Sequence, residues 1–311
     1  MKKYDLSIII TSYNTKEITK NCLESILKSL KNTSLNFEII VVDNHSTDGS
    51  LEILKEYSSN YSNTRLPSLD SGLSGQVRII KNKENLGFSK ANNQGVKMAR
   101  SDYILFLNSD VVVLDDAIEK LYKFYKQQEN KINFLGGKLL NKDRTPQPSC
   151  GPFYTLPVVF AALFLRGDYF GVTRYSPSKV KEVDWISGAC ILTNKQYFNT
   201  MGGFDENIFM YMDEIDLLHR AKKQGYKVFF YPGALFIHLG SASSGGRKYP
   251  ILQVFNGLMY FYKKHYSKPD QILLKIMLKL KALIGLAIGQ IFNNKYLKET
   301  YGKAFEMVKL D

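Results

Sequence analysis

Residues 104–113 read ILFLNSDVVV. Four apolar residues are followed at once by Asn108, Ser109 and Asp110, and three valines come next. A short apolar run bounded by polar residues is typical of a strand buried within a parallel sheet. Ligands of such sheets bind beyond the carboxyl ends of the strands. We therefore predict a central strand at residues 103–107 and a binding site that includes Asp110.

The segments before this strand repeat the arrangement twice. An apolar run at residues 6–10 stops at the polar residues 11–14, and a second run, FEIIVV, stops at Asp43. Apolar residues at helical spacing follow both runs, at residues 16–30 and 51–57. Strands that alternate with helices in this way predict βαβ units and a parallel sheet. We expect the polar residues at the strand ends to meet along one edge of that sheet.

The rest of the chain predicts further elements of an α/β fold. Residues 58–76 are rich in Ser, Asn, Gly and Pro, which favours a surface insertion. Residues 141–182 contain five of the nine prolines, which favours long loops. The regular elements expected are a strand at residues 77–80, a helix from Ser89 to Ala99, a helix at residues 115–129, a strand at residues 183–194, a helix that ends near Gln224 and a strand that ends at Phe230.

The end of the chain is strongly basic. Residues 263–311 contain ten lysines and four acidic residues, and apolar residues recur there at helical spacing. The uncharged part, residues 282–292, is much shorter than the roughly 20 residues that a membrane-spanning helix needs. One interpretation is a basic amphipathic helix on an anionic bilayer surface. The alternative is a helix that packs on the core or on a second subunit. The excess of lysines favours the membrane surface.

Composition narrows the class of protein. The 311 residues carry a net charge of +13, which favours anionic partners such as phosphorylated small molecules, nucleic acid or an acidic membrane. Cys22, Cys150 and Cys190 are far apart and form no C-x-x-C pair, so a disulfide framework or a zinc site is not expected. The apolar run near the N-terminus is too short for a signal peptide, and we expect a cytoplasmic protein.

Several polar residues at the expected strand ends suit a nucleotide. Asp43 and Asn44 can accept and donate hydrogen bonds to uracil, thymine or ribose. The segment NLGFSKANNQG contains Gly87, which lets the backbone approach a ligand closely, and then Asn92 and Asn93 on the first turns of a helix. Each of these residues alone is more often a turn former than a ligand contact. Their occurrence at successive strand ends favours binding.

Seven motifs occur in the order and spacing of a known family. They are SIIITSYN, VVDNHSTDGS, NLGFSKANNQG, FLNSDVVV, SGACILTN, GGFDENIFMYMDEIDLLHR and FIHLGSASS. On these motifs, residues 4–245 resemble the family 2 glycosyltransferases, which have the GT-A fold and transfer sugars from nucleotide-diphosphate sugars with inversion. The segment FMYMDEIDLLHR is most similar to the rhamnosyltransferase-like members, which build bacterial surface polysaccharides.

The resemblance implies a domain organisation and partners. Residues 1–250 would form the GT-A domain, with its nucleotide-binding half at about 1–112 and its acceptor-side half at about 113–250. Residues 251–311 would form a helical, membrane-associating extension. The implied donor is dTDP-rhamnose or a UDP-sugar, and the implied acceptor is a hydroxyl of a glycan or a lipid-linked sugar. We expect an enzyme on the inner face of the cell membrane that binds no nucleic acid, and a homodimer stays open.

The resemblance also implies a divalent metal, Mn²⁺ or Mg²⁺, that stabilises the diphosphate leaving group. Asp110 occupies the position of the family's metal-binding aspartate, and His238 matches a histidine that reaches the metal or the diphosphate. The family's first acidic position is Asn108 here, so we expect metal and nucleotide to bind together. The residues implied to bind the nucleotide sugar are Thr11, Ser12, Tyr13, Asn14, Asp43, Asn44, Asn85, Gly87, Phe88, Asn92, Asn93, Asn108, Ser109 and Asp110.

An inverting transfer needs a base that takes the proton of the acceptor hydroxyl. The candidates lie in MYMDEIDLLHR, where acidic residues could also simply stabilise the first turn of a helix. The family usually has Glu-Asp, with the second acid as base, whereas this chain has Asp213-Glu214. Position implies Glu214, and Asp213 stays open as the base or as a sugar contact. Asp216 is expected to be structural and to pair with Arg220.

Three residues are expected on the sugar and acceptor side. Trp185 could stack on a sugar or belong to the core, and Gly188 and Ala189 would leave room for the donor sugar.

Three rival functions remain. A sugar nucleotidyltransferase would carry a glycine-rich basic loop near the first strand, which TSYNTKEIT lacks. A nucleic-acid-binding module would combine basic residues with aromatics on one platform. An inactive scaffold would not need Asp110, Glu214 and His238.

Overall fold

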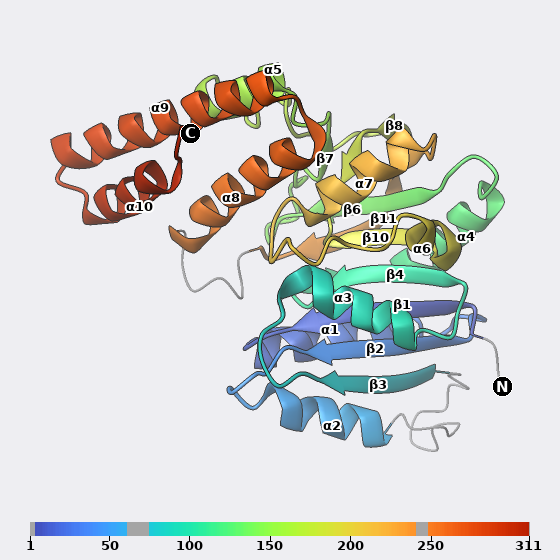
Figure 1. The fold of residues 1–311 in the computed structure, drawn as a ribbon. Coiled ribbons are helices and arrows are strands. Elements are labelled where there is room, and N and C mark those ends of the chain that lie inside the picture. Colours follow the sequence, from blue (N-terminus) through green and yellow to red (C-terminus); the bar gives the residue numbers. More distant parts are fainter. Residues whose placement is uncertain (1–3, 61–74, 241–247, 311) are drawn as a thin grey trace.

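The computed structural model describes residues 4–60, 75–240 and 248–310. Most of the insertion expected at residues 58–76 lies outside the described residues, as does the end of the motif FIHLGSASS. The described residues form one nine-stranded sheet with helices on both faces, a two-stranded sheet beside it and three C-terminal helices (Figure 1). The predicted α/β class is confirmed.

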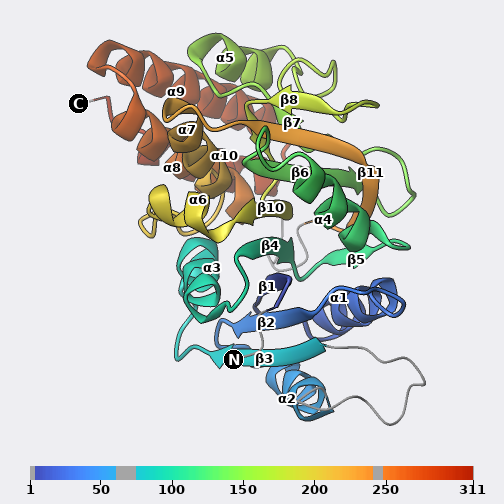
Figure 2. The same cartoon turned by 90° about the vertical axis from the view of Figure 1, so that its right-hand side faces the viewer.

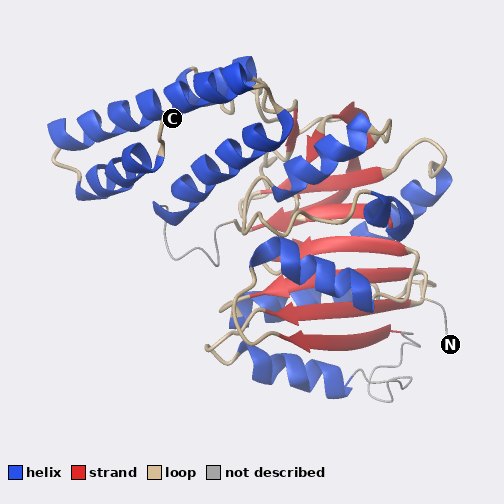
Figure 3. Ribbon diagram, viewed as in Figure 1, coloured by secondary structure: helices blue, strands red, loops and turns tan. Residues whose placement is uncertain are grey.

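The first half of the sheet is entirely parallel, as the alternation of strands and helices predicts. Its strands stand in the order β3-β2-β1-β4. The register pairs Ser12 with Asp43 and Thr11 with Asn108, so the polar strand ends meet at one edge (Figure 3, arrowheads). These elements are β1 (Leu6–Ser12), α1 (Lys16–Ser29), β2 (Phe37–Asp43), α2 (Ser50–Asn60), β3 (Gly75–Lys81), α3 (Gly87–Met98) and β4 (Tyr103–Asn108).

The second half of the sheet mixes parallel and antiparallel pairs. β10 runs antiparallel to both β4 and β6 and thereby joins the two halves. The elements are β5 (Val111–Val113), α4 (Ala117–Gln127), β6 (Phe134–Leu140), β7 (Cys150–Gly151), α5 (Leu156–Phe164), β8 (Lys181–Val183), β9 (Trp185–Ile186), β10 (Cys190–Asn194), α6 (Lys195–Thr200), α7 (Asp213–Lys223) and β11 (Val228–His238). β7 and β9 form the small sheet.

Two strand predictions were wrong in their extent. The strand expected at residues 183–194 is divided among the end of β8, β9 and β10. β8 and β10 belong to the large sheet and β9 to the small one, and a turn at residues 187–189 lies between β9 and β10. The strand expected to end at Phe230 continues to His238. Its pairing with β6 shifts between Tyr231 and Leu235, where Pro232 cannot donate a ladder hydrogen bond. Because a proline often marks the end of a strand, the sequence predicted that this strand ends before Pro232.

Two apolar cores cover the faces of the sheet. α3, α6 and α7 lie on one face, and α1 and α4 lie on the other (Figure 2). Side chains alternate between faces along a strand, so Ile8 and Ile10 pack with Cys22 of α1, whereas Ile9 packs with Val96 of α3. All three cysteines are buried and free, as expected.

Three helices follow the sheet: α8 (Lys248–His265), α9 (Lys268–Ile291) and α10 (Lys295–Met307) (Figure 1, orange to red). The inner face of α9 is buried through Leu274 and Leu278, and Gly285 of α9 lies against Tyr301 of α10. The Lys281 ammonium group donates to the carbonyl of Leu163 in α5 at 2.7 Å. Within the described ranges, no helix combines the length and apolarity that crossing a membrane requires.

Candidate active site

A cavity of about 630 Å³ opens at the carboxyl ends of β1, β2 and β4. Its size is typical of a small-molecule site. The turn at residues 187–189, the segment at residues 209–215 and α8 complete its wall. Fifteen of the predicted site residues line it: Thr11, Tyr13, Asn44, Asn85, Gly87, Phe88, Asn108, Ser109, Asp110, Trp185, Gly188, Ala189, Asp213, Glu214 and His238.

Three predicted nucleotide contacts, Ser12, Asn14 and Asp43, do not line the cavity. Ser12 is fully buried, and its hydroxyl lies 2.9 Å from that of Thr19. Asn14 is exposed, and its side-chain oxygen accepts from the backbone N–H of Thr47 at 2.8 Å. Asp43 is fully buried, and within the described part of the chain its Oδ1 has no hydrogen-bond partner. Asp43 therefore keeps an unused acceptor next to the pocket-lining Asn44, whereas Ser12 and Asn14 hold other segments of the protein.

The amides of Asn92 and Asn93 also hold the protein together. Asn92 donates to the carbonyl of Phe88 at 3.0 Å. Asn93 donates to the carbonyl of Phe204 at 2.9 Å and accepts from the Phe204 N–H at 3.0 Å. Neither residue lines the cavity. Asn93 binds α3 to the segment that precedes α7, and so it acts on the site through the position of that segment.

Asp110 and His238 form the candidate metal pair. Asp110 Oδ1 lies 3.3 Å from His238 Nε2, because β5 pairs with the end of β11 and brings the two residues together. Gln147 holds the other side of the imidazole. Its Oε1 lies 2.7 Å from His238 Nδ1, and its Nε2 donates to the backbone carbonyl of His238. Gln147 therefore orients the imidazole ring so that its Nε2 edge faces Asp110.

The pair fits Mn²⁺ or Mg²⁺ only in part. A carboxylate oxygen and an imidazole nitrogen are ordinary ligands of Mn²⁺. Across the described ranges, however, no group of three or more His, Cys, Asp or Glu side chains could hold a metal ion. Two protein ligands leave several positions for phosphate oxygens or water. The geometry is therefore compatible with a metal that binds together with a diphosphate.

Asp213 and Glu214, the two candidates for the base, are the first two residues of α7. Asp213 is 4% exposed and Glu214 is partly buried, and both line the cavity. Burial raises the pKa of both groups, and the neighbouring Glu214 charge raises that of Asp213 further. Glu214 Oε1 accepts from the backbone N–H of Gly188 at 3.4 Å, which directs Glu214 toward the turn before β10.

Two strained residues precede this carboxyl pair. Tyr211 and Met212 have φ angles of +66° and +69°, although neither is glycine. Gly257 of α8 packs against them, since a Cβ at this position would lie 2.8 Å from Met212 Cγ. Val254 and Leu258 of α8 line the cavity. Residues of the expected C-terminal extension therefore supply part of the wall of the cavity.

A buried ionic cluster joins α7 to α8. Asp216 is fully buried and accepts from Arg220 Nε at 2.8 Å, as expected. It also accepts from Lys264 and from His265 Nε2, 2.8 and 2.7 Å away. Burial alone would raise the pKa of Asp216, but the hydrogen bond of His265 and the charges of Arg220 and Lys264 hold that pKa below its ordinary value. The two partners from α8 were missed, because residues so far apart in sequence give no pattern.

Trp185 belongs to the core and also lines the cavity. It is 2% exposed, and its indole N–H donates to the carbonyl of Pro152 at 2.8 Å, yet its ring lines the cavity. Tyr154 stacks on this ring with the centroids 6.1 Å apart, and the guanidinium carbon of Arg174 lies 5.5 Å from the ring centroid. Trp185 is thus a wall of the pocket rather than an exposed platform. Tyr154 and Arg174 lie in the proline-rich stretch, where no motif drew attention to them.

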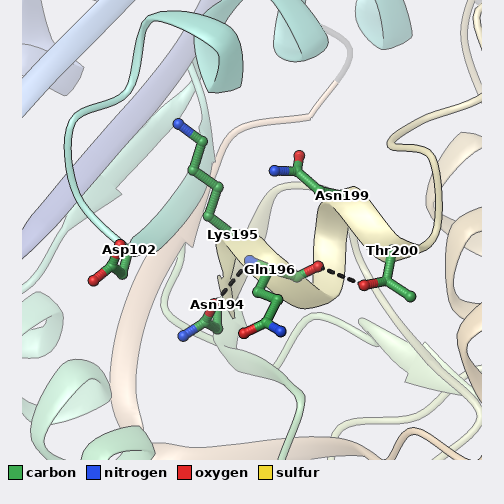
Figure 4. Close-up of a pocket in the computed structure, with 6 residues that line it drawn as sticks. All are labelled: Asp102, Asn194, Lys195, Gln196, Asn199 and Thr200. Atoms are coloured by element: carbon green, nitrogen blue, oxygen red, sulfur yellow. Dashed lines mark hydrogen bonds between the residues drawn. The ribbon is translucent and has the colours of Figure 1, made fainter.

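A second recess lies at the opposite end of β4 and β10. Figure 4 shows its polar lining residues, which are Asp102, Asn194, Lys195, Gln196, Asn199 and Thr200. The side chains of Asn194 and Thr200 bond to backbone atoms of Gln196 in the short helix α6. Gln196, Asn199 and Thr200 are exposed, so this recess is a shallow feature of the surface.

Comparison with known proteins identifies the family. The family model described as Glycosyl transferase family 2 matches residues 7–172, which is more than half of the chain. The chain belongs to this family. A glycosyltransferase of Streptococcus pneumoniae serotype 4, GlyG, is 32% identical over 75% of the chain and 70% of its own length.

Two further relatives match different shares of the chain and of their own lengths. The N-acetylglucosaminyl-diphospho-decaprenol L-rhamnosyltransferase of Mycobacterium tuberculosis is 28% identical over 72% of the chain and 73% of its own length. The poly(ribitol-phosphate) beta-glucosyltransferase of Bacillus spizizenii is 33% identical over 43% of the chain, which corresponds to 19% of that longer protein. The expected resemblance to rhamnosyltransferase-like members is thereby confirmed.

Solved structures of glycosyltransferases share the fold. GalNAc-T7 with UDP, GalNAc and Mn²⁺ superposes with a TM-score of 0.61 at 14% identity, over 97% of this chain and 55% of that one. S. aureus TarS 1-349 in complex with UDP-GlcNAc superposes with a TM-score of 0.56 at 16% identity, over 98% of this chain and 82% of that one. The expected GT-A fold is confirmed by these likenesses.

Proposed function

We propose that this family 2 glycosyltransferase moves a sugar from a nucleotide-diphosphate sugar to a saccharide hydroxyl with inversion at the anomeric carbon. The observation that carries the proposal is a single cavity that contains both parts of such a site. Polar strand ends and the Asp110–His238 pair line it, and so do two carboxyl groups with raised pKa values. The first set suits the donor, and the second suits the acceptor hydroxyl.

Glu214 acts as the base in this proposal. Its deprotonated carboxylate takes the proton of the acceptor hydroxyl while that oxygen attacks the anomeric carbon from the face opposite the diphosphate. The bond from the anomeric carbon to the diphosphate oxygen breaks, and the nucleoside diphosphate leaves with the bonding electrons. A raised pKa makes the carboxylate a stronger base near neutral pH. The Gly188 N–H holds Glu214 in place, and Asp213 remains the alternative base.

Asp110 and His238 would hold Mn²⁺ or Mg²⁺ with the diphosphate. When bound, the metal neutralises the negative charge that develops on the leaving group. Gln147 fixes the imidazole so that Nε2 faces Asp110. Mn²⁺ accompanies UDP in the GalNAc-T7 structure, which supports this part of the proposal.

The donor is proposed to be a UDP-sugar or dTDP-rhamnose. Asp43 has an unpartnered Oδ1 among the described residues, and this oxygen would accept the ring N–H that uracil and thymine share. UDP-GlcNAc is bound in the TarS structure, and the mycobacterial relative is named a rhamnosyltransferase. That relative's name also contains a lipid-linked sugar, which supports a lipid-linked acceptor in bacterial surface polysaccharide synthesis.

The enzyme is proposed to lie on the cytoplasmic face of an anionic membrane through α9. The outer face of this helix exposes apolar side chains at intervals of four residues, which is unusual for a surface that contacts only water. They include Ile272, Ile276, Leu280, Ile284 and Ile288, each between 40% and 48% exposed. The lysines of residues 263–311 would add attraction to acidic lipids. A homodimer stays a prediction.

A donor screen tests the proposed function. The protein would be heated with Mn²⁺ and each of a panel of UDP-, dTDP- and GDP-sugars, and any stabilising donor would then enter a hydrolysis assay. We expect one UDP- or dTDP-sugar to raise the melting temperature and to be hydrolysed slowly. Formation of pyrophosphate from a nucleoside triphosphate and a sugar 1-phosphate would instead show a nucleotidyltransferase and overturn the proposal.

A further inference from the structure

Arg174 places a positive charge in the active-site cavity. Its guanidinium carbon lies 5.5 Å from the centroid of the Trp185 ring, and Arg174 lines the cavity together with Tyr154 and Trp185. The Nε atom is buried, and among the residues that the structure describes it has no hydrogen-bond partner. A buried donor without a partner is rare in native proteins and carries a desolvation cost. In a binding cavity, such a cation indicates an anionic ligand.

The backbone holds Arg174 firmly in this position. The N–H of Tyr175 donates to the carbonyl of Cys150 in β7 at 2.9 Å, and the N–H of Thr173 donates to the carbonyl of Gly167. Gly151 permits the close approach of this segment, since a Cβ there would lie 2.3 Å from the carbonyl oxygen of Thr173. A cation that is fixed before the ligand arrives loses little entropy on binding.

The location of Arg174 favours the acceptor rather than the donor. The donor diphosphate is proposed to bind at Asp110 and His238, which stand at the ends of strands of the large sheet. Arg174 instead stands beside the small sheet. Arg174 and the proposed base Glu214 line the same cavity, and the charge of Arg174 partly opposes the increase that burial causes in the pKa of Glu214. The acceptor must place its reacting hydroxyl at that base.

The residues before Arg174 suggest what carries the anion. Tyr169, Phe170 and Val172 are 82%, 69% and 57% exposed, so apolar side chains face outward within a few residues of the cation. The segment follows α5, which packs on α9, the helix proposed to face the membrane. A partly buried cation in the cavity with exposed apolar side chains beside it suits a molecule in which a phosphate joins a sugar to an apolar chain.

We propose that Arg174 binds the phosphate of a lipid-linked sugar acceptor and so brings the sugar hydroxyl to Glu214. This inference rests on the proposed function, because it assigns an acceptor to the same site. A guanidinium group suits phosphate through paired, planar N–H donors, which a lysine side chain cannot reproduce. The phosphate remains intact during the reaction, and Arg174 serves in binding and positioning.

Kinetics with paired acceptors test the assignment. Wild-type protein, Arg174→Met and Arg174→Lys would be compared on N-acetylglucosamine joined to one short alkyl chain, either through a diphosphate or as the neutral glycoside. We expect Arg174→Met to raise KM for the diphosphate acceptor by about 10- to 100-fold and to lose the preference over the neutral one. Arg174→Lys should recover part of the preference. Lys179→Met removes an exposed charge nearby and serves as the control.

A binding measurement tests the role of Arg174 separately from the proposed glycosyl transfer. Farnesyl diphosphate would be titrated into each variant by calorimetry, which requires no turnover and no donor. We expect binding to wild type and to Lys179→Met, and weak binding to Arg174→Met at an unchanged melting temperature. Equal binding to Arg174→Met, or a preference for the diphosphate acceptor that survives this substitution, would overturn the role of Arg174. Weaker binding of UDP and dTDP in Arg174→Met, with acceptor KM unchanged, would assign Arg174 to the donor instead.

Discussion

Asp110 and His238 are 128 positions apart in the sequence, and β5 and β11 bring them within 3.3 Å. The sequence could predict Asp110, because an apolar run that ends in a carboxylate marks the end of a buried strand. Gln147 could not be predicted, because an amide in a proline-rich loop belongs to no periodic pattern. Its role follows only from its contact with His238 Nδ1.

Asp110→Asn should abolish the effect of metal on nucleotide binding. The substitution keeps the size of the side chain but removes the charge that attracts the cation. We expect Mn²⁺ to tighten UDP or dTDP binding to wild type by about tenfold or more and to leave the variant unaffected, as measured by calorimetry. Asp115→Asn, at an exposed position outside the cavity, is the matched control. Retention of the metal effect in Asp110→Asn would assign the metal elsewhere.

Glu214→Gln should retain donor binding and lose transfer. An amide cannot take a proton from the acceptor, so kcat should fall by about 10²- to 10⁴-fold. In wild type, kcat should decline as the pH falls through the raised pKa of Glu214, above the ordinary range for a glutamate. Asp213→Asn is the comparison. An active Glu214→Gln beside an inactive Asp213→Asn would identify Asp213 as the base.

Asp213→Asn should stabilise the protein near neutral pH. Burial raises the pKa of Asp213 in the folded state, so the stability present below its ordinary pKa is lost as the pH rises through the raised value. The melting temperature of the variant should match wild type near pH 4 and exceed it near pH 7, as measured by calorimetry. Asp205→Asn should have the opposite effect and lower the melting temperature near pH 7. Burial raises the pKa of Asp205, but hydrogen bonds from Lys264 and Tyr260 hold it well below its ordinary value.

At the scale of elements, the predicted helices and strands of the first half agree with the structure within a few residues. Each has a clear period and a polar end. The errors lie where a short turn divides one predicted strand or where a proline interrupts a strand. Ser187, Gly188 and Ala189 separate β9 from β10, and Pro232 lies inside β11. The contribution of α8 to the cavity was also missed, since a basic tail gives no signal of where it folds back.

Gly257→Ala should lower kcat by displacing the strained segment before α7. Its methyl group would lie 2.8 Å from Met212 Cγ and 3.1 Å from the carbonyl oxygen of Tyr211, so that segment must move. Gly302→Ala in α10 is the control, because nothing lies within 4 Å of its Cβ position. Replacing glycine within a helix contributes about 1 kcal/mol of stability where space is available. We expect Gly302→Ala to be active and slightly more stable. Full activity of Gly257→Ala would show that the packing of α8 against Met212 does not control the position of the base.

At the scale of the whole molecule, α9 presents an apolar face to the outside while its other face is packed. Removing α9 would be a poor test of membrane binding, because α9 buries Leu274 and Leu278. Substitutions on the exposed face are cleaner. The sequence predicted an amphipathic helix here, although it could not show which face would be covered by α8, α5 and α10.

The double substitution Ile276→Asp, Leu280→Asp should reduce binding to vesicles that contain phosphatidylglycerol by about tenfold or more. Both side chains are nearly half exposed, so the fold should tolerate the change. Co-sedimentation measures the bound fraction, and binding of wild type should weaken as salt screens the lysines. The control is Lys179→Asp, an exposed position outside the helix. Unchanged sedimentation of the double variant would favour a second subunit as the partner of this face.

The ionic cluster at Asp216 bears on how the chain matures. Asp216 has Arg220 within its own helix, but its other partners, Lys264 and His265, come from a helix that is synthesised later. While the chain is being made, α7 can form before the charges that complete its burial exist. A nascent chain that ends before Lys264 would bury a carboxylate with one cation alone and would lack the support of α8 behind Met212. The wall of the active site is therefore completed only after α8 has been translated, even though the nucleotide half is finished much earlier.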